Sequence, residues 1–201
     1  TVGHEKWEGN EGMKSAQLRD VIATKPIIKV MGAHNGLGAK LIERNHFDAI
    51  WACGLEISSS HGVPDANILT MTDNLVAAQA IHEATTLPVI CDCDTGYGNA
   101  ANVKYMVKKY EAAALDAVVI EDKLVPKVNS FIPGRQELAS IEEFMGKLEA
   151  AKSAQKDPNF MVFARVEALI AGWGMHEALQ GALAYAYAGA DVIVIHSNFE
   201  T

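Results

Sequence analysis

Six short apolar runs recur along the chain, and segments with helical periodicity separate them. The runs are rich in Val, Ile, Ala and Met and cover residues 26–34, 49–54, 88–94, 117–122, 161–168 and 191–197. Between them, segments such as residues 100–115 and 140–154 carry apolar side chains every three or four positions. Strands that alternate with helices predict βαβ units and a parallel sheet.

Polar and ionisable side chains stand at the carboxyl end of each predicted strand. They are His34, Cys53, Asp92, Asp94, Glu121, Asp122, Arg165, Glu167, His196 and Ser197. In a (β/α)8 barrel the loops after the strands build the active site, whereas a doubly wound open sheet concentrates its ligands at one switch point. Because all six predicted strands contribute, we expect an α/β fold of the (β/α)8 TIM-barrel type.

The expected domain organisation follows from the number of strands. A barrel of this type needs eight strands and roughly 250 residues, and the 201 residues of this sequence supply about six of the eight β/α units. We expect residues 23–201 to form a C-terminally incomplete barrel domain, with two units absent through truncation or disorder. Residues 1–22 are expected to be an N-terminal arm or helix, because the opening GHEKWEGNEG lacks periodicity.

Composition and charge narrow the classes of partner. The formal net charge is -8, and without a basic patch this disfavours binding to nucleic acid or anionic membranes. No apolar run approaches the ~18 residues that a membrane span needs. The three cysteines lack the spacing of a disulfide framework or a zinc site, which favours a reducing compartment. We therefore expect a cytoplasmic protein without a nucleic-acid or membrane partner.

The segment CDCDTGYGN, residues 91–99, contains the densest set of candidate ligands. In a strand, successive side chains point to opposite faces, so Asp92 and Asp94 share one face while Cys91 and Cys93 share the other. Carboxylates packed against the helix layer would be strongly desolvated, whereas cysteine behaves there as a small hydrophobe. We predict that the aspartates face the barrel interior and the cysteines face the helices.

The same aspartates predict a metal site. Carboxylate oxygens without a neighbouring histidine suit Mg²⁺, with Mn²⁺ as the alternative. Asp65, Glu121 and Asp122 are further acids near strand ends, and several converging acids would repel one another without a cation. We predict that Asp92, Asp94 and Glu121 bind the metal ion. The alternative is that some of these acids cap helices or form ion pairs.

Several motifs carry a resemblance to a known family. CDCDTGYGNAANV resembles an element of the phosphoenolpyruvate mutase and isocitrate lyase superfamily. Similar motifs occur in the order GAHNGLGAKL, WACGLEISSSHGVPDAN, EDKLVPKVNSF, ARVEALIAGWG and GADVIVIHS, and the resemblance covers nearly all the chain from about Pro26 onward. It implies a (β/α)8 barrel that binds Mg²⁺, stabilises a pyruvate-like enolate, and forms homodimers or homotetramers that exchange their last helix.

The loop KLVPKVNSF, Lys123 to Phe131, distinguishes the chemistries of the superfamily. Its isocitrate lyase-like carbon–carbon lyases carry a cysteine and a histidine in this loop, and this chain has neither, so a lyase or decarboxylase of the superfamily is only the third alternative. Asn129 resembles the mutase branch, which interconverts phosphoenolpyruvate and phosphonopyruvate, whereas phosphonopyruvate hydrolases have threonine there. Val125 in place of phenylalanine, Cys53 in place of serine, and the hydrolase-like VPDANIL depart from the mutase pattern, so a hydrolase is the alternative.

The resemblance also implies roles for individual residues. The expected metal residues are Asp92 as a direct ligand and Asp94, Glu121 and Asp65 as holders of metal-bound waters. The small anionic substrate is expected to contact Trp51 and the main-chain N–H groups of Cys53, Gly54 and Leu55. Arg165 and His196 are expected to engage its anionic groups, while Asn129 and Lys127 hold the migrating phosphoryl group from a closing loop.

Each of these roles has a simpler alternative. Trp51 and His196 could be core residues, and Arg165 could serve only to pair with Glu167 on the same strand face. Lys123 and Lys127 could be solvated loop charges.

Overall fold

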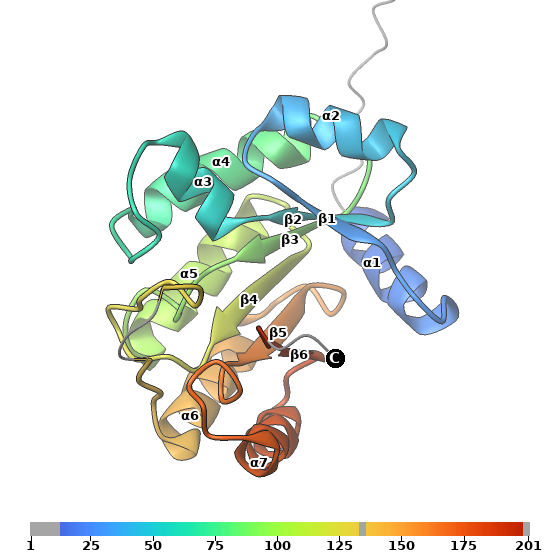
Figure 1. Ribbon diagram of the computed structural model, residues 1–201. Helices are drawn as coiled ribbons and strands as arrows, with labels where there is room; N and C mark the ends of the chain where they lie inside the picture. Colours follow the sequence, from blue (N-terminus) through green and yellow to red (C-terminus); the bar gives the residue numbers. More distant parts are fainter. Residues whose placement is uncertain (1–12, 133–135, 199–201) are drawn as a thin grey trace, which may run out of the picture.

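Six parallel strands form one sheet in the computed structural model, which describes residues 13–132 and 136–198 (Figure 1). The strands are β1 (Val30–Ala33), β2 (Ala49–Ala52), β3 (Val89–Asp92), β4 (Ala117–Glu121), β5 (Met161–Val166) and β6 (Val192–Ile195). Each strand pairs in parallel with the next one along the chain, so the sheet order is β1-β2-β3-β4-β5-β6. This sequential order, in a sheet that curls, confirms the partial (β/α) barrel.

Seven helices occur in the described residues. They are α1 (Met13–Thr24), α2 (Gly36–Arg44), α3 (Gly54–Ser60), α4 (Met71–Glu83), α5 (Ala100–Ala112), α6 (Ile141–Ala154) and α7 (Met175–Tyr187). Local caps explain where several of them begin. Thr70 and Asp73 form a capping box at α4, and the Asn99 side chain accepts from the main chain of Asn102 at α5. None of these helices is long and apolar enough to cross a membrane.

The core has two layers because the central strands β3, β4 and β5 are buried on both faces. Residues such as Cys91, Val118, Ile120 and Val162 pack outward against the helices. A second cluster lies inside the curled sheet and contains Ala49, Ile90, Ala117, Val119, Met161 and Phe163. The alternation expected from the sequence is thus present in every central strand.

Helix α1 closes the amino-terminal end of the barrel. Leu18 is fully buried in the inner cluster. Arg19 pairs with Asp191 at 2.9 Å, and the Ser15 hydroxyl donates to the Asp157 carboxylate at 3.0 Å. Of the arm or helix expected over residues 1–22, residues 1–12 lie outside the described residues, and α1 begins at Met13.

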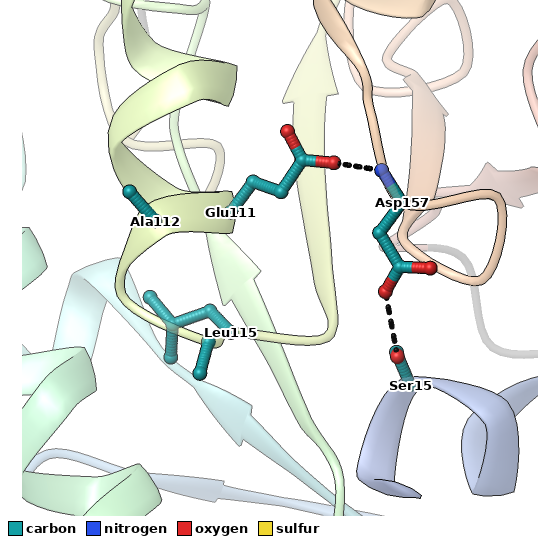
Figure 2. Close-up of a pocket in the computed structure, with 6 residues that line it drawn as sticks. Ser15, Glu111, Ala112, Leu115 and Asp157 are labelled. Atoms are coloured by element: carbon teal, nitrogen blue, oxygen red, sulfur yellow. Dashed lines mark hydrogen bonds between the residues drawn. The ribbon is translucent and has the colours of Figure 1, made fainter. Parts of the chain in front are cut away.

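A cavity of about 250 Å³ lies between α1, the end of α5 and the loop before β5 (Figure 2). The carboxylate of Glu111 accepts from the main-chain N–H of Asp157, whose own carboxylate accepts from Ser15. Both acids that line this cavity therefore hold elements together, and the cavity lies at the end of the barrel opposite the strand-end acids.

Candidate active site

The carboxyl ends of β3, β4 and β5 bring Asp92, Glu121 and Arg165 together. Glu121 and Arg165 are register partners on neighbouring strands, so their side chains leave the sheet on the same face. Arg165 Nη1 lies 3.2 Å from Asp92 Oδ2, and Arg165 Nη2 contacts Glu121 Oε2. All three side chains are largely buried, so these charges interact in a poorly solvated environment.

The alternation predicted for CDCD is confirmed. Cys91 and Cys93 are buried in the helix-facing core, and burial raises the pKa of both thiols well above the usual value. Asp92 and Asp94 lie on the opposite face and form the ion pairs of the site. The cysteines therefore stay protonated and take no part in the acid cluster.

Glu167 connects the β5 and β6 ends. One oxygen lies 2.9 Å from Arg165 Nε and 2.7 Å from His196 Nδ1. The other accepts from Ser130 Oγ at 2.9 Å and lies 3.4 Å from Lys123 Nζ. Burial raises the pKa of the Glu167 carboxyl, but the bond from His196 and the charges of Arg165 and Lys123 outweigh burial and lower it to about 2. The simpler alternative was that Arg165 serves only to pair with Glu167. Arg165 does pair with Glu167, but it also pairs with Asp92 and Glu121.

Lys127 holds a second group of acids. Its Nζ lies 2.5 Å from Asp94 Oδ1 and 3.0 Å from Asp65 Oδ1. Burial would lower the pKa of this ammonium, but the charges of Asp94, Asp92 and Asp65 raise it above its usual value. Lys127 is therefore a cation at all physiological pH values.

The two aspartates of the CDCD segment differ in their ionisation. Burial raises the pKa of Asp92, but the charges of Arg165 and Lys127 outweigh it and leave the pKa below its usual value. The pKa of Asp94 is raised, first by burial and then by the neighbouring charge of Asp92, against the effect of Lys127. Asp92 is thus the more firmly ionised of the pair.

Residues 123–132, in the loop after β4, lie over these acids. Asn129 Nδ2 donates to Asp65 Oδ2 at 2.9 Å, and Asn129 Oδ1 accepts from the main chain of Phe131. Lys123 and Lys127 are 2% and 4% exposed, so the alternative that they are solvated loop charges is wrong. Lys123 Nζ instead donates to Val128 O and to Ser130 Oγ inside the loop.

The expected substrate-binding residues border the acids from β2 and α3. Trp51 is partly buried in the inner cluster, and its side chain contributes to the lowered pKa of Asp92, after the larger effects of burial, Arg165 and Lys127. A Cβ built on Gly54 would lie 3.6 Å from both Asp92 Oδ2 and Asp94 Oδ1, so the start of α3 directly adjoins the acids. The main-chain N–H of Cys53 donates to Ala33 O at 3.1 Å, which leaves Gly54 and Leu55 as the main-chain donors to consider.

Asp122 does not join the other acids, although it follows Glu121 directly. It faces the helix layer, where it accepts from Tyr185 Oη and from the main chain of Glu167, both at 2.9 Å. Strand alternation explains the difference, since Glu121 occupies the inward position.

The residues at the barrel mouth have the chemistry of a divalent-cation site. Five carboxylates lie there beside three buried basic side chains, namely Asp65, Asp92, Asp94, Glu121 and Glu167 beside Lys123, Lys127 and Arg165. With all eight side chains ionised, the five carboxylates exceed the three basic groups by two negative charges. In addition, Glu121 Oε1 is a buried oxygen that accepts no hydrogen bond from the described residues.

The acids do not form a closed cage. Within residues 13–132 and 136–198, no group of three or more His, Cys, Asp and Glu side chains already surrounds a point where an ion could bind. Mg²⁺ usually takes one or two carboxylates and keeps several waters. The oxygen donors of Asp92, Asp94, Glu121 and Asp65 therefore fit this ion without a closed cage.

Two residues of the site were missed by sequence reasoning. Asn67 bridges Asp94 and the main chain of Lys127, and Ser130 bridges Lys123 and Glu167. Both residues lie in segments that matched family motifs, VPDAN and KVNSF. The local sequence does not indicate their hydrogen bonds to Asp94, Lys127 and Glu167, because these partners are 27 to 60 residues away along the chain.

Known proteins resemble this chain over most of its length. The family model for phosphoenolpyruvate phosphomutase matches residues 18–201. A phosphonopyruvate hydrolase from Variovorax sp. (strain Pal2) is 50% identical over 189 residues, which are 94% of this chain and 65% of that protein.

Two solved structures show the same similarity in three dimensions. A phosphoenolpyruvate phosphomutase from Streptomyces platensis subsp. rosaceus has a TM-score of 0.89 and 61% identity, over 91% of this chain and 64% of that one. A phosphonopyruvate hydrolase in complex with oxalate and Mg²⁺ has a TM-score of 0.87 and 48% identity, over 94% of this chain and 64% of that one.

The matched length and the identities establish the family. The chain spans 64 to 65% of the length of these three proteins. Its family match begins within α1 and continues to residue 201, across all six strands. The chain belongs to the phosphoenolpyruvate phosphomutase family.

Proposed function

We propose that the protein containing this chain interconverts phosphoenolpyruvate and phosphonopyruvate. The proposal rests on the identity and position of residue 129. The Asn129 amide donates to Asp65 at 2.9 Å from a loop that lies over the acid cluster. An asparagine at this position resembles the pattern of the mutase branch. The 61% identity to a phosphoenolpyruvate phosphomutase supports the same branch.

The metal ion belongs to the proposal. Asp92, Asp94 and Glu121, with Asp65, are the residues that would hold Mg²⁺, and Mn²⁺ is the alternative. When bound, the cation would neutralise the carboxylate and the enolate oxygen of the substrate. The neighbouring hydrolase with oxalate and Mg²⁺ supports this assignment, because oxalate is a dianion that resembles the pyruvate enolate in size and charge.

The chain's own residues would bind and orient the pyruvyl part. Gly54 lies beside the acids, and its main-chain N–H and that of Leu55, the next residue, can donate to the substrate carboxylate, with Trp51 as a wall. Arg165 can turn its planar guanidinium toward an oxyanion with two N–H donors. His196 is held through Nδ1 by Glu167, which leaves its Nε2 for the phosphoryl group.

The transfer itself requires the phosphoryl group to leave C3 and reach the enolate oxygen. The P–C bond breaks, its electron pair passes into the enolate, and the enolate oxygen then attacks phosphorus. Asn129 and Lys127 would steady the phosphoryl oxygens during this passage, since positioning and charge stabilisation supply most of the catalysis in phosphoryl transfer. The loop would also keep water from phosphorus.

Phosphonopyruvate hydrolysis is the second candidate. The 50% identity to the Variovorax hydrolase favours it, as does the VPDANIL segment. Both reactions begin with the same P–C cleavage, and they differ in whether the enolate oxygen or water accepts the phosphoryl group.

Phosphorus NMR separates the two reactions. The full-length protein is incubated with Mg²⁺ and phosphonopyruvate, with an EDTA-treated sample as the control. A phosphoenolpyruvate signal that needs the metal is the expected result. Inorganic phosphate in its place identifies the hydrolase, and an unchanged phosphonopyruvate signal contradicts both reactions.

We further propose a homodimer or homotetramer in the cytoplasm. The family resemblance supports the assembly, and the three free cysteines support a reducing compartment. Light scattering coupled to size-exclusion chromatography of the full-length protein measures the oligomer, and a monomeric mass contradicts it.

A further inference from the structure

The loop that carries Lys127 and Asn129 rests on a short turn after α3. Asp65 in this turn contacts Lys127 Nζ at 3.0 Å and accepts from Asn129 Nδ2 at 2.9 Å. Asn67, two residues later, accepts from the main-chain N–H of Lys127 at 2.6 Å through Oδ1. Its Nδ2 donates to Asp94 Oδ2 at 2.9 Å. Asn67 therefore links the end of β3 to the main chain of the loop.

The chemistry of this bridge requires an amide. The loop N–H needs an acceptor and the Asp94 carboxylate needs a donor, and the asparagine side chain supplies both on adjacent atoms. Aspartate at this position would direct a second carboxylate at Asp94. The backbone of Asn67 has a φ of 54°, a left-handed conformation that asparagine and glycine adopt more readily than other residues.

Polar contacts are the main attachment of this loop. Leu124, Val125, Val128 and Phe131 are between 37% and 64% exposed, so apolar burial holds the loop only weakly. Lys123 fixes its later part through Val128 O and Ser130 Oγ. In the middle of the loop, the side chains of Lys127 and Asn129 contact Asp94 and Asp65, and Asn67 is the residue that holds the main chain at Lys127.

We propose that Asn67 is a positioning residue that sets how tightly this loop closes over the acids. Through Lys127 and Asn129, loop closure then controls whether the phosphoryl group reaches the enolate oxygen or water. This second consequence rests on the proposed function, whereas the effect on the loop does not.

Two substitutions in the full-length protein test the bridge. Asn67→Gly removes both hydrogen bonds and keeps the backbone conformation, and Asn67→Asp keeps the shape but replaces the donor with a charge. Asn45→Ala is the matched control, because Asn45 also donates one side-chain hydrogen bond, to Leu41 O, at the C-cap of α2. Thermal unfolding followed by circular dichroism establishes that each variant is folded, and if Asn67→Asp fails to fold, Asn67→Gly alone decides.

Tryptic cleavage after Lys127 measures loop opening without any substrate. Lys127 is buried, so cleavage requires the loop to open, and the cleavage rate follows the open population when reclosing is fast. Loss of the bridge should raise this rate about tenfold in Asn67→Gly, and more in Asn67→Asp. The rate in Asn45→Ala should equal that of the unsubstituted protein.

Phosphorus NMR with Mg²⁺ and phosphonopyruvate then measures the products. Both Asn67 variants should release a larger fraction of inorganic phosphate than the unsubstituted protein. An unchanged cleavage rate in both variants overturns the positioning role whatever the activity. Faster cleavage with an unchanged product ratio and kcat overturns the control of the reaction. Failure of the unsubstituted protein to form phosphoenolpyruvate or phosphate contradicts the proposed function, while the cleavage rates still decide the role of Asn67 in the loop.

Discussion

The acids at the barrel mouth differ from one another because each has different partners. Glu167 has two cations and a histidine around it, and its pKa falls to about 2. Asp94 is buried and has Asp92 as a neighbour, and both raise its pKa. At neutral pH Glu167 is therefore a fixed anion that orients Arg165 and His196, while the Asp92–Asp94 pair is the part of the site whose charge a cation would stabilise.

Asn129 is the residue on which the proposed reaction depends most. We predict that Asn129→Ala lowers the kcat for phosphoenolpyruvate formation by about a hundredfold or more, the usual effect of losing a preorganised donor to a transferring anionic group. Mg²⁺ affinity should be retained, because Asn129 contacts Asp65 but not Asp92. Turnover is followed by phosphorus NMR and Mg²⁺ binding by calorimetry, and an undiminished kcat contradicts the assignment.

We predict that the free energy of unfolding depends on pH through Asp122, which lies outside the acid cluster. Burial raises its pKa from 3.8 to about 6. The folded protein therefore binds this proton more tightly than the unfolded chain, so stability falls as the pH rises from about 4 to 6 and stays lower above that. The shift corresponds to about 3 kcal/mol at most.

The matched test is Asp122→Asn, which removes the titration and keeps an acceptor for the main chain of Glu167. This variant should have a larger free energy of unfolding than the unsubstituted protein at pH 8, and the difference should vanish near pH 4. Urea denaturation across this range measures it, with the exposed Asp20→Asn as the control. A stability difference that is the same at both pH values contradicts the prediction.

At the scale of elements, α1 completes the inner core from the amino-terminal end. Leu18 is fully buried among side chains of the central strands, whereas Leu41 on α2 is 52% exposed. We predict that Leu18→Ala lowers the free energy of unfolding by about 3 kcal/mol, since it opens a cavity in a packed core. Leu41→Ala should cost less than about 1 kcal/mol. Chemical denaturation compares the two, and equal losses contradict the docking of α1.

The arrangement of elements also explains how far the sequence alone could reach. All six predicted strands occur, each within the predicted range, because the apolar runs and period-two alternation are local properties. The same alternation correctly separated Asp92 from Cys93. The same rule predicts that Glu121 faces the barrel interior and Asp122 faces the helices. It was not applied to this pair, so Asp122 was wrongly grouped with the other acids near strand ends.

At the scale of the whole molecule, the excess negative charge of the barrel mouth predicts stabilisation by Mg²⁺. A ligand that binds the folded state alone adds about 3 kcal/mol at a hundred times its Kd. The midpoint temperature of thermal unfolding of the full-length protein should therefore rise by several degrees with Mg²⁺ and return to its starting value with EDTA. The Asp92→Asn variant should lose most of this rise. Equal midpoints with Mg²⁺ and with EDTA contradict a metal site.

Local patterns along the chain are enough to predict the alternating strands and helices, the face on which Asp92 and Asp94 lie, and the family, because these depend on neighbouring residues or on ordered motifs. The pairing of charges, in contrast, depends on the folded structure. Asn67 and Lys127 are 60 residues apart, and Arg165 and Asp92 are 73 apart. Such contacts depend on how the sheet curls and where each loop returns, and no local period encodes them. The burial of Lys123 and Lys127 and the bridge through Asn67 therefore emerged only from the folded chain.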